Sequence, residues 1–525
     1  MRCSLASSIA VTCATVLALP VSLAAPAAAA VPSALGLPPA ATAQPPAPEL
    51  PGATQSLPLE PLDAGDRSLG GGADDADVQG LTRRDVRPFS LVGVVWDDPA
   101  AALHGVVQVR TRATGGGAWS EWQDVETHNE EHGADPDTAE GHGRALKGST
   151  APLWVGDSDG VEIRVRGDEP LPEGLRLELV DPGEAPGGAP AQDPAQEPET
   201  TATPATAATA AAEAAAVTAV TKASWSRTTA GSLALAGLSA AQAAVSGVNT
   251  QLAPFGSAWI PALSKEATEL TLPFAPAPGE AQAPQAAPHV LPDEAQAPDE
   301  AQAAEAQAPA EAQAPEQLAA AKPYIGPRPK IITRAGWGAD ERIREKGFVY
   351  TKTIKAAFVH HSATGNNYTC AQAPSVLRSI YRYHVQSSGW RDFGYNFAVD
   401  KCGNIYEGRA GGVAKPVLGA HTLGFNTNSM GIAVLGTFTK SNPPAAVVTA
   451  VARLTAWKLG LHGVNPKGSA YLVSGGGNLY KKGSTVKLNA IAGHRDGFAT
   501  ECPGARLYGK LGTARTSSAK YQGRS

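Results

Sequence analysis

The chain of 525 residues lacks any uninterrupted run of about 20 apolar residues, the length that a membrane-spanning helix requires. Its most apolar stretch, within residues 1–30, is broken by Ser, Thr and Pro20, so we expect no integral membrane segment. That stretch instead combines an early arginine, an apolar run and small residues with A-x-A character, a pattern typical of secretory signal peptides. We therefore expect a signal peptide at 1–30 and a secreted protein.

Cysteine is also scarce, with five in the whole chain. Cys3 and Cys13 would leave with the signal peptide, so Cys370, Cys402 and Cys502 would remain in an oxidising compartment. An odd number excludes complete pairing within one chain. Either one thiol stays free and reactive, or two form a disulfide and other chemistry protects the third.

Much of the chain has too little apolar surface to form a core, since it contains 43 prolines, 56 glycines and long alanine-rich stretches. Residues 186–325 are dominated by Ala, Pro, Glu, Gln and Thr, and the motif "EAQAP" occurs there four times. Such a composition predicts a disordered linker. Residues 232–259 are richer in apolar side chains, but their Gly, Ser and Pro content predicts no particular element.

Short apolar runs separated by Gly, Pro and Asp fill residues 80–185, for example "FSLVGVVWDD" and "VEIRVRG". This pattern predicts a small all-β accessory domain. Its four tryptophans, which could stack on sugars, are more simply explained as core residues: Trp96, Trp119, Trp122 and Trp154.

Positive charge is concentrated near the C-terminus, where residues 331–525 contain 25 Lys and Arg against 8 Asp and Glu, although the whole chain has a formal net charge of −6. A cationic surface suits an anionic partner such as nucleic acid, membrane lipid or a wall polymer. The export signal and the lack of any recognisable nucleic-acid module argue against nucleic acid. A basic surface that serves only solubility is the simpler alternative.

Two histidine-bearing motifs follow apolar runs in this half. "AAFVHHSAT" predicts a buried strand that ends at His360 and His361, and "AIAGHRD" predicts a second strand that delivers His494. Side chains alternate across a strand, so His360 and His361 point to opposite faces. We expect His360 to bind a metal ion, because its side chain lies on the same face of the strand as Phe358. His361 would then pack in the core or support its neighbour.

A catalytic zinc uses three protein ligands and keeps an open position, and imidazoles and a thiolate are suitable ligands. Cys502, in "AGHRDGFATECPG", would complete the count with His360 and His494. Pro503 and Gly504 constrain the backbone after it. The plain alternative is an ordinary buried cysteine before a helix N-terminus.

Five motifs occur in an order that resembles the peptidoglycan recognition proteins and the related type 2 N-acetylmuramoyl-L-alanine amidases, in the form of secreted actinobacterial members. They are "RAGWGAD", "FVHHSAT", "GWRDFGYNFAVDKCGNIYEGR", "GAHTLGFNTNSMGIAVLGTF" and "AGHRDGFATECPG". The resemblance covers about residues 325–515. It implies a domain at 326–515 with a mixed central β-sheet flanked by helices, an α/β fold preceded by the all-β domain and the linker.

The resemblance implies that Zn²⁺ is held by His360, His494 and Cys502. It also implies that Tyr395 stabilises the reacting carbonyl, and Thr500 lies where family members place a catalytic threonine or lysine. A distant branch of the family uses a glutamate as base in the strand that here reads "GIAVLG". This chain has Ala433 there, so the proton acceptor is not identified by the resemblance.

The same resemblance implies a substrate-binding groove at the ends of the site strands. The residues that we expect to line it are His361, His421, Trp390, Arg409 and Asn426. His421 is placed at the groove edge and is also a candidate for relaying a proton. With Cys502 assigned to the metal, we expect Cys370 and Cys402 to form a disulfide.

Amphipathic periodicity predicts helices at 375–387 and 445–463, and apolar runs near residues 356, 395, 405, 431 and 490 predict the strands of the sheet. The expected function is hydrolysis of the lactyl–L-alanine amide of peptidoglycan by a secreted or wall-associated monomer. Peptidoglycan is the expected partner, without nucleic acid. The alternative is a peptidoglycan-binding protein that lacks catalysis.

Overall fold

The computed structural model describes residues 52–62, 78–129, 132–138, 141, 145–184, 239–272 and 324–525. The expected signal peptide lies outside these ranges, as does most of the expected linker. Among the described residues, no helix is both long and apolar enough to cross a membrane.

The N-terminal part of the structure is an antiparallel β-domain with the strand order β1-β8-β3-β7-β4-β5, in which β2 and β6 also pair with β3. Its strands are β1 (Ala53–Pro58), β2 (Glu60–Pro61), β3 (Val78–Trp96), β4 (Gly105–Ala113), β5 (Gln123–Val125), β6 (Gly148–Ser149), β7 (Leu153–Gly167) and β8 (Arg176–Asp181). The all-β prediction is confirmed, but the domain begins before residue 80, because β1 and β2 extend the sheet. We call residues 52–184 the β-domain.

The tryptophans of the β-domain divide into two pairs. Trp96 and Trp154 are buried in apolar clusters. Trp119 and Trp122 are partly exposed, and arginine guanidinium groups lie over their rings, with Arg164 4.3 Å from the centroid of Trp122. The core interpretation therefore holds for Trp96 and Trp154 and is wrong for Trp119 and Trp122.

The C-terminal part contains a seven-stranded mixed sheet with the order β17-β11-β14-β12-β13-β10-β9 and a separate β15–β16 hairpin. The strands are β9 (Trp259–Ile260), β10 (Ile331–Ile332), β11 (Ala356–His361), β12 (Phe397–Val399), β13 (Ile405–Glu407), β14 (Ser429–Val434), β15 (Ser469–Val473), β16 (Thr485–Asn489) and β17 (Ile491–Gly493). The helices are α2 (Ala240–Gly247), α3 (Lys265–Thr271), α4 (Arg334–Trp337), α5 (Ala373–Arg382), α6 (Ala445–Gly460), α7 (Ala505–Tyr508) and α8 (Leu511–Tyr521). This architecture confirms the predicted α/β fold.

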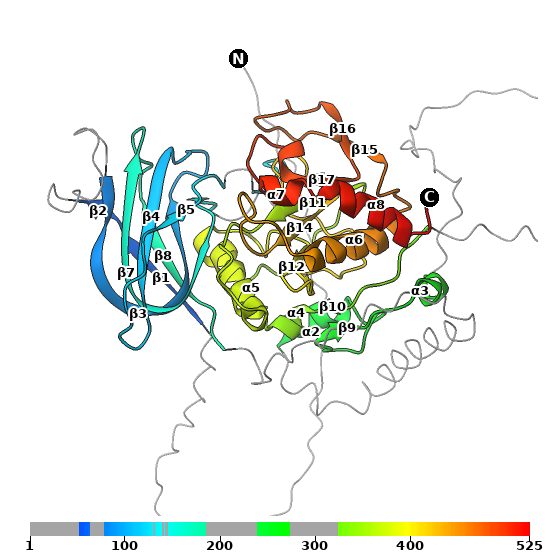
Figure 1. Cartoon of the computed structure of the whole chain (residues 1–525), viewed down its shortest axis with the longest axis horizontal. Helices are drawn as coiled ribbons and strands as arrows, with labels where there is room; N and C mark the ends of the chain where they lie inside the picture. Colours follow the sequence, from blue (N-terminus) through cyan, green and yellow to red (C-terminus); the bar gives the residue numbers. More distant parts are fainter. Residues whose placement is uncertain are drawn as a thin grey trace, which may run out of the picture. The chain divides into compact units, whose positions relative to one another are not determined.

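The central strands are parallel and buried on both faces, which is why their sequences read as continuous apolar runs. Helices α6 and α8 lie side by side over one face of this sheet (Figure 1) and share an apolar cluster with β11, β12 and β14. Helix α5 packs with Ala398 and Ala433 in the apolar cluster of the other face. A π-helical turn, Tyr383–Ser387, extends α5 to the end of the predicted range.

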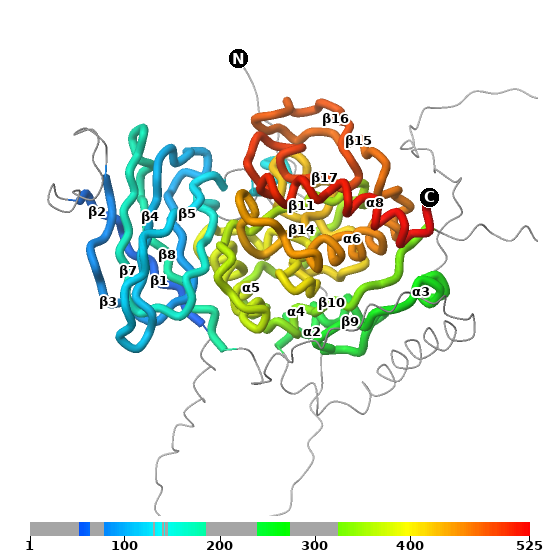
Figure 2. Tube along the Cα trace, viewed as in Figure 1, coloured from blue at the N-terminus to red at the C-terminus, as the bar shows by residue number. Residues whose placement is uncertain are grey.

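Residues 239–272 correct the expected linker, because they fold against the C-terminal part instead of remaining structureless. Strand β9 pairs with β10 at the sheet edge, as the trace in Figure 2 also shows. Ser239 begins α2 with a capping box, and the Asn249 side chain donates to the buried carboxylate of Glu407. Specific tertiary partners therefore order a segment whose composition favours disorder. We call residues 239–272 with 324–525 the C-terminal unit.

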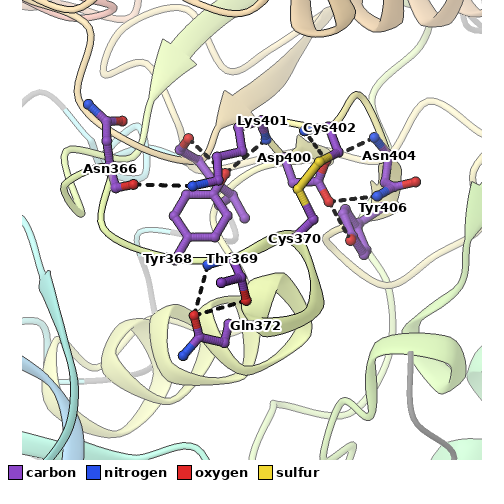
Figure 3. The surroundings of a disulfide bond; sticks show 11 residues. Asn366, Tyr368, Thr369, Cys370, Gln372, Asp400, Lys401, Cys402, Asn404 and Tyr406 are labelled. Carbon is purple, nitrogen blue, oxygen red and sulfur yellow. Dashed lines mark hydrogen bonds between the residues drawn. A yellow bond between two sulfur atoms is a disulfide. The ribbon is translucent and has the colours of Figure 1, made fainter. Parts of the chain in front are cut away.

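The predicted disulfide is present and joins Cys370 to Cys402, at a sequence separation of 32 (Figure 3). Cys370 begins the 3₁₀ turn before α5, and Cys402 lies in the turn between β12 and β13. The Asp400 carboxylate accepts hydrogen bonds from the backbone amides of Cys402 and Asn404, both at 2.9 Å. The turn is thus held by polar contacts as well as by the disulfide.

The β-domain packs on α5 and the turn that follows it. Tyr383 is fully buried, and its hydroxyl lies 3.2 Å from the Val94 carbonyl oxygen and 3.0 Å from that of Thr150. The Trp154 amide donates to the Thr364 carbonyl at 3.1 Å. An apolar cluster with residues from both parts lies in the same place.

Candidate metal centre

The site lies where two parallel strands of the C-terminal unit end together. Strand β11 pairs with β17 in a register that places Val359 opposite Gly493, so the next residues, His360 and His494, lie side by side. Their ring centroids are 4.4 Å apart, and both side chains are fully buried. The two predicted histidines therefore meet because of strand register.

Cys502 returns to the same place after the turn that follows β17. Its carbonyl accepts from the Arg495 amide at 3.0 Å, which closes the loop between them. Its Sγ lies 3.8 Å from Nδ1 of His360. Gly504 adopts a left-handed φ of 84°, and a Cβ there would lie 2.4 Å from the Phe438 carbonyl carbon. Glycine therefore allows the close backbone approach that aims Cys502 inward.

A fourth donor, His132, comes from the β-domain and was not predicted. Its Nε2 lies 3.9 Å from Sγ of Cys502, and its ring centroid lies 4.5 Å from that of His494. The side chain is buried. The sequence signal that could have drawn attention to it is the polar, histidine-bearing stretch "THNEEHGADPD".

The donor set fits a metal ion. The candidate ligand atoms of these four residues lie within 4.8 Å of one another, and no other group of this kind occurs among the described ranges. Ligands at about 2.0 to 2.3 Å from one ion would lie within about 4.6 Å of one another. Three imidazoles and a thiol are donors that zinc accepts in tetrahedral sites. The cluster could therefore hold a metal after small side-chain adjustments.

Burial keeps the imidazoles neutral, the form that can bind a metal. Burial, with a smaller contribution from the neighbouring His361, lowers the pKa of His132 to about 3. Burial also lowers the pKa of His360 well below its ordinary value, with added contributions from His494 and His421. The lone pairs that coordination requires are therefore available at neutral pH.

Tyr395 and Thr500 lie beside the cluster, as a catalytic role would require. The Tyr395 ring centroid is 5.2 Å from that of His360, and Thr500 Oγ1 accepts from the Cys502 amide at 3.1 Å. Both line a pocket that is formed jointly by the two parts of the structure. Its lining comprises Glu126, His128, Asn129, His132, Ala151 and Pro152 from the β-domain and His361, Ser362, Ala363, Ile380, His384, Tyr395, Thr500, Glu501 and Cys502 from the C-terminal unit.

His361 also lines this pocket, although it leaves β11 on the face opposite His360. Its Nδ1 accepts a hydrogen bond from the Phe438 amide at 3.3 Å. Burial lowers its pKa to about 4, with a smaller contribution from the charge of Arg495. A neutral ring at the pocket wall is compatible with a contact to substrate.

His421 does not lie at a groove edge, in contrast to the expectation. It is fully buried, and its ring centroid is 5.4 Å from that of His360. A Cβ at Gly431 would lie 2.4 Å from Cγ of His421, so this glycine makes room for the ring. Nδ1 of His421 lies 3.0 Å from Oγ1 of Thr422. In this position the His421 ring packs against the His360 ring.

Trp390 and Arg409 lie outside the lining of this pocket, in contrast to the expectation. The Trp390 ring stacks on His384 at 4.3 Å, and only His384 reaches the pocket wall. Arg409 is buried, and its guanidinium donates to the carbonyls of Phe393 and Leu418. Arg409 therefore holds the surrounding backbone and Trp390 packs on His384, roles that motif position alone does not reveal.

Asn426 lies close to the site but contacts the β-domain. Its Oδ1 accepts from the backbone amides of His421 and Thr422 at 2.7 and 3.1 Å. Its Nδ2 donates to the Gly133 carbonyl at 2.8 Å and to the Asp135 carboxylate at 3.0 Å. The donor that we expected to meet substrate therefore meets a segment of the same chain.

Two family models match this chain. Residues 350–505 match the model described as N-acetylmuramoyl-L-alanine amidase. Residues 39–208 match the model described as Rv3811 N-terminal galactose-binding domain-like. The second match covers the β-domain, for which the motifs of the C-terminal half gave no relative.

Curated relatives align with the C-terminal part. Peptidoglycan-recognition protein SC1a of Drosophila melanogaster is 30% identical over 192 residues, which cover 36% of this chain and 87% of that protein. The human N-acetylmuramoyl-L-alanine amidase is 30% identical over 190 residues, which cover 35% of this chain and 28% of that protein. Among solved structures, Drosophila PGRP-LB is 25% identical with a TM-score of 0.28, covering 35% of this chain and 92% of that one.

Proposed function

Because the chain belongs to the family of peptidoglycan-recognition proteins and N-acetylmuramoyl-L-alanine amidases, we propose that it is a secreted zinc-dependent amidase. Its substrate is the amide between the lactyl group of N-acetylmuramic acid and the L-alanine of the stem peptide. The observation that carries this proposal is the convergence of His360, His494 and Cys502 in one buried cluster beside Tyr395.

His360, His494 and Cys502 would hold a zinc ion, which as a Lewis acid would activate water and polarise the amide carbonyl. The chain's own residues do the rest. Tyr395, at the pocket wall, donates a hydrogen bond from its hydroxyl to the oxygen on which negative charge develops. Buried surroundings strengthen that hydrogen bond because they exclude water.

We assign proton transfer to the leaving amine of L-alanine to the hydroxyl group of Thr500. Thr500 lies two residues before Cys502 and lines the pocket with it. Ala433 lies opposite His360 in the β11–β14 register, so β14 contributes no carboxylate at that position. We propose that the Thr500 hydroxyl relays a proton from the attacking water to the leaving amine, which is the final proton acceptor.

Secretion and a wall substrate agree with two further features. The Cys370–Cys402 disulfide is of the kind that persists in oxidising compartments. The excess of Lys and Arg in residues 331–525 favours binding to an anionic polymer. We place the protein outside the cell or in the wall, with peptidoglycan as its partner.

Recognition of peptidoglycan without catalysis is the second candidate, favoured by the burial of the whole cluster in this structure. It is the weaker one, since a recognition protein has no need for a thiol beside two imidazoles. The test is incubation of purified sacculi with the full chain and with a His132→Ala variant, each with and without chelator. Mass analysis should find released peptides with a free L-alanine amino group only when metal is present. New reducing sugar ends, or no release by either protein, would contradict the amidase proposal.

A further inference from the structure

His132 gives the metal centre one donor more than the proposed reaction needs. A catalytic zinc site has three protein ligands and keeps a position for water, whereas four protein ligands are typical of closed structural sites. Three ligands are already provided by His360, His494 and Cys502. The candidate ligand atom of His132 lies within 4.8 Å of each of theirs. An imidazole at the fourth position would exclude the water that hydrolysis requires.

The residues that follow His132 are fixed to the C-terminal unit by polar contacts. The Asp135 carboxylate accepts from the Gly424 amide at 2.6 Å and from Nδ2 of Asn426 at 3.0 Å. The same Nδ2 donates to the Gly133 carbonyl at 2.8 Å. At the exposed end, Asp137 forms an ion pair with Lys482. The described residues 132–138 therefore lie along the metal centre in one defined position.

These contacts resemble those that a peptide of the wall would make. The buried carboxylate of Asp135 accepts from a backbone amide and from a side-chain amide. The Gly133 carbonyl accepts from the same side-chain amide. A stem peptide offers the same two acceptor groups. The motif suggests Asn426 as a substrate contact, but the segment occupies its Nδ2 and the amides of His421 and Thr422 occupy its Oδ1, so a peptide could not use it at the same time.

The segment also closes the site to a polymer. His360 and His494 have no exposed surface, and Cys502 is 3% exposed. Pocket walls from the β-domain narrow the access to the site. A glycan strand with attached peptides is far too large to enter such a space, so the β-domain must withdraw before cleavage.

From these observations we propose that residues 132–138 are an inhibitory segment that keeps the full chain latent. His132 occupies the fourth ligand position, and Asp135 occupies the donors that bind a peptide of the substrate. The proposal rests on the proposed amidase function. Release breaks no covalent bond, because it requires only that His132 leave the metal and that the contacts of Asp135 and Asp137 be exchanged for water or wall peptide.

Metal coordination tests the proposal without reference to activity. Zinc-edge X-ray absorption of the zinc-loaded full chain should show three imidazoles and one sulfur. The His132→Ala variant should show two imidazoles, one sulfur and an oxygen ligand. His104, exposed in the β-domain, provides the matched control, and His104→Ala should keep three imidazoles. Two imidazoles in the parent chain would overturn the proposal.

Cleavage of a soluble muramoyl dipeptide provides the second readout, with zinc content measured for each protein. His132→Ala should raise kcat/KM at least about 10-fold over the parent, since one ligand of the closed site is removed. Asp135→Ala leaves the four metal donors unchanged but removes two hydrogen bonds to a charged group, so kcat/KM should rise at least about 10-fold. Asp135→Ala also decides the question if His132→Ala does not fold.

The outcomes separate this inference from the proposed function. Equal cleavage by the parent and by both variants would overturn latency and leave the amidase intact. No cleavage by any protein would contradict the amidase, whereas a gain of oxygen ligation in His132→Ala would still support the role of His132. Faster cleavage by His132→Ala and Asp135→Ala, with unchanged cleavage by His104→Ala, would support both the latency and the amidase function.

Discussion

Replacing Tyr383 with phenylalanine should loosen the contact between the β-domain and the C-terminal unit. Tyr383 belongs to the C-terminal unit, but its hydroxyl lies 3.0 Å from the Thr150 carbonyl and 3.2 Å from the Val94 carbonyl of the β-domain. The ring is fully buried at that contact. Tyr383→Phe keeps the ring and removes only the group that crosses the boundary.

The size of the effect follows from the Thr150 carbonyl, which loses its donor, whereas the Val94 carbonyl still accepts from the Thr150 amide at 2.9 Å. Leaving a buried polar group unsatisfied costs about 1 to 3 kcal/mol. If this cost applies only to the docked arrangement, undocking becomes about 5- to 150-fold more favourable. Gly93→Ala should act at the same place, because its Cβ would lie 2.4 Å from the Tyr383 hydroxyl oxygen.

Hydrogen exchange of amides that bridge the boundary measures this change directly. The Trp154 amide donates to Thr364, and the Lys147 amide donates to Ser388 at 3.2 Å. We expect both amides to exchange about 5- to 150-fold faster in Tyr383→Phe, within the limits of the docking equilibrium. If latency depends on docking, cleavage of muramoyl dipeptide should rise by a similar factor.

Tyr381→Phe is a matched control two residues away. Tyr381 is also buried, but its hydroxyl donates to the Asp340 carbonyl at 3.1 Å within the C-terminal unit. This variant should lower the stability of that unit and leave the exchange of the Trp154 amide unchanged. Unaltered exchange in Tyr383→Phe, or equal acceleration in both variants, would refute the reasoning.

Three further predictions concern stability and metal binding. Replacing Cys370 and Cys402 by serine should lower the free energy of unfolding by about 3 to 4 kcal/mol, as expected for a separation of 32 residues, and denaturant unfolding that shows less than about 1 kcal/mol would contradict it. Cys502→Ser should weaken zinc binding at least about 10-fold in a chelator competition and abolish cleavage of sacculi, because the thiolate donor is lost; unchanged zinc affinity would argue against Cys502 as a ligand. Burial raises the pKa of Glu407 to about 7, although Asn249 and Arg334 oppose the shift. The folded protein therefore binds a proton that the unfolded chain releases near pH 4.5, so stability should fall as pH rises from about 4.5 through 7, and Glu407→Gln should be more stable than the parent at pH 8 but not at pH 5. Denaturation at both pH values checks this, and a parent that gains stability between them would contradict the assignment.

Several elements of the fold were predictable because they depend on local patterns. The runs that became β11 and β14 are apolar because both faces of a central parallel strand are covered. The helical spacing of apolar residues in α6 predicted a helix, because those residues are buried against the sheet. By contrast, β9 has only two residues, and its position at the sheet edge depends on pairing with β10. A two-residue strand has no period that could be recognised.

The candidate site divides in the same way. His360, His494 and Cys502 were found because each lies in a recognisable motif, and alternation along β11 separated His360 from His361. The surroundings of His421, Trp390 and Arg409 were not predictable. A motif fixes the order of residues along the chain, but whether a side chain meets solvent depends on what packs over it.

The sequence by itself determined that this protein has an all-β part and a cationic α/β part, and it predicted three candidate metal donors, because these follow from composition, periodicity and ordered motifs. Only the tertiary structure decided that His132 joins those donors and that Asp135 takes the amides of Gly424 and Asn426. The physical reason is the long sequence separation. No local preference couples residue 132 to residue 502, so their contact exists only through the docking of one folded part on another.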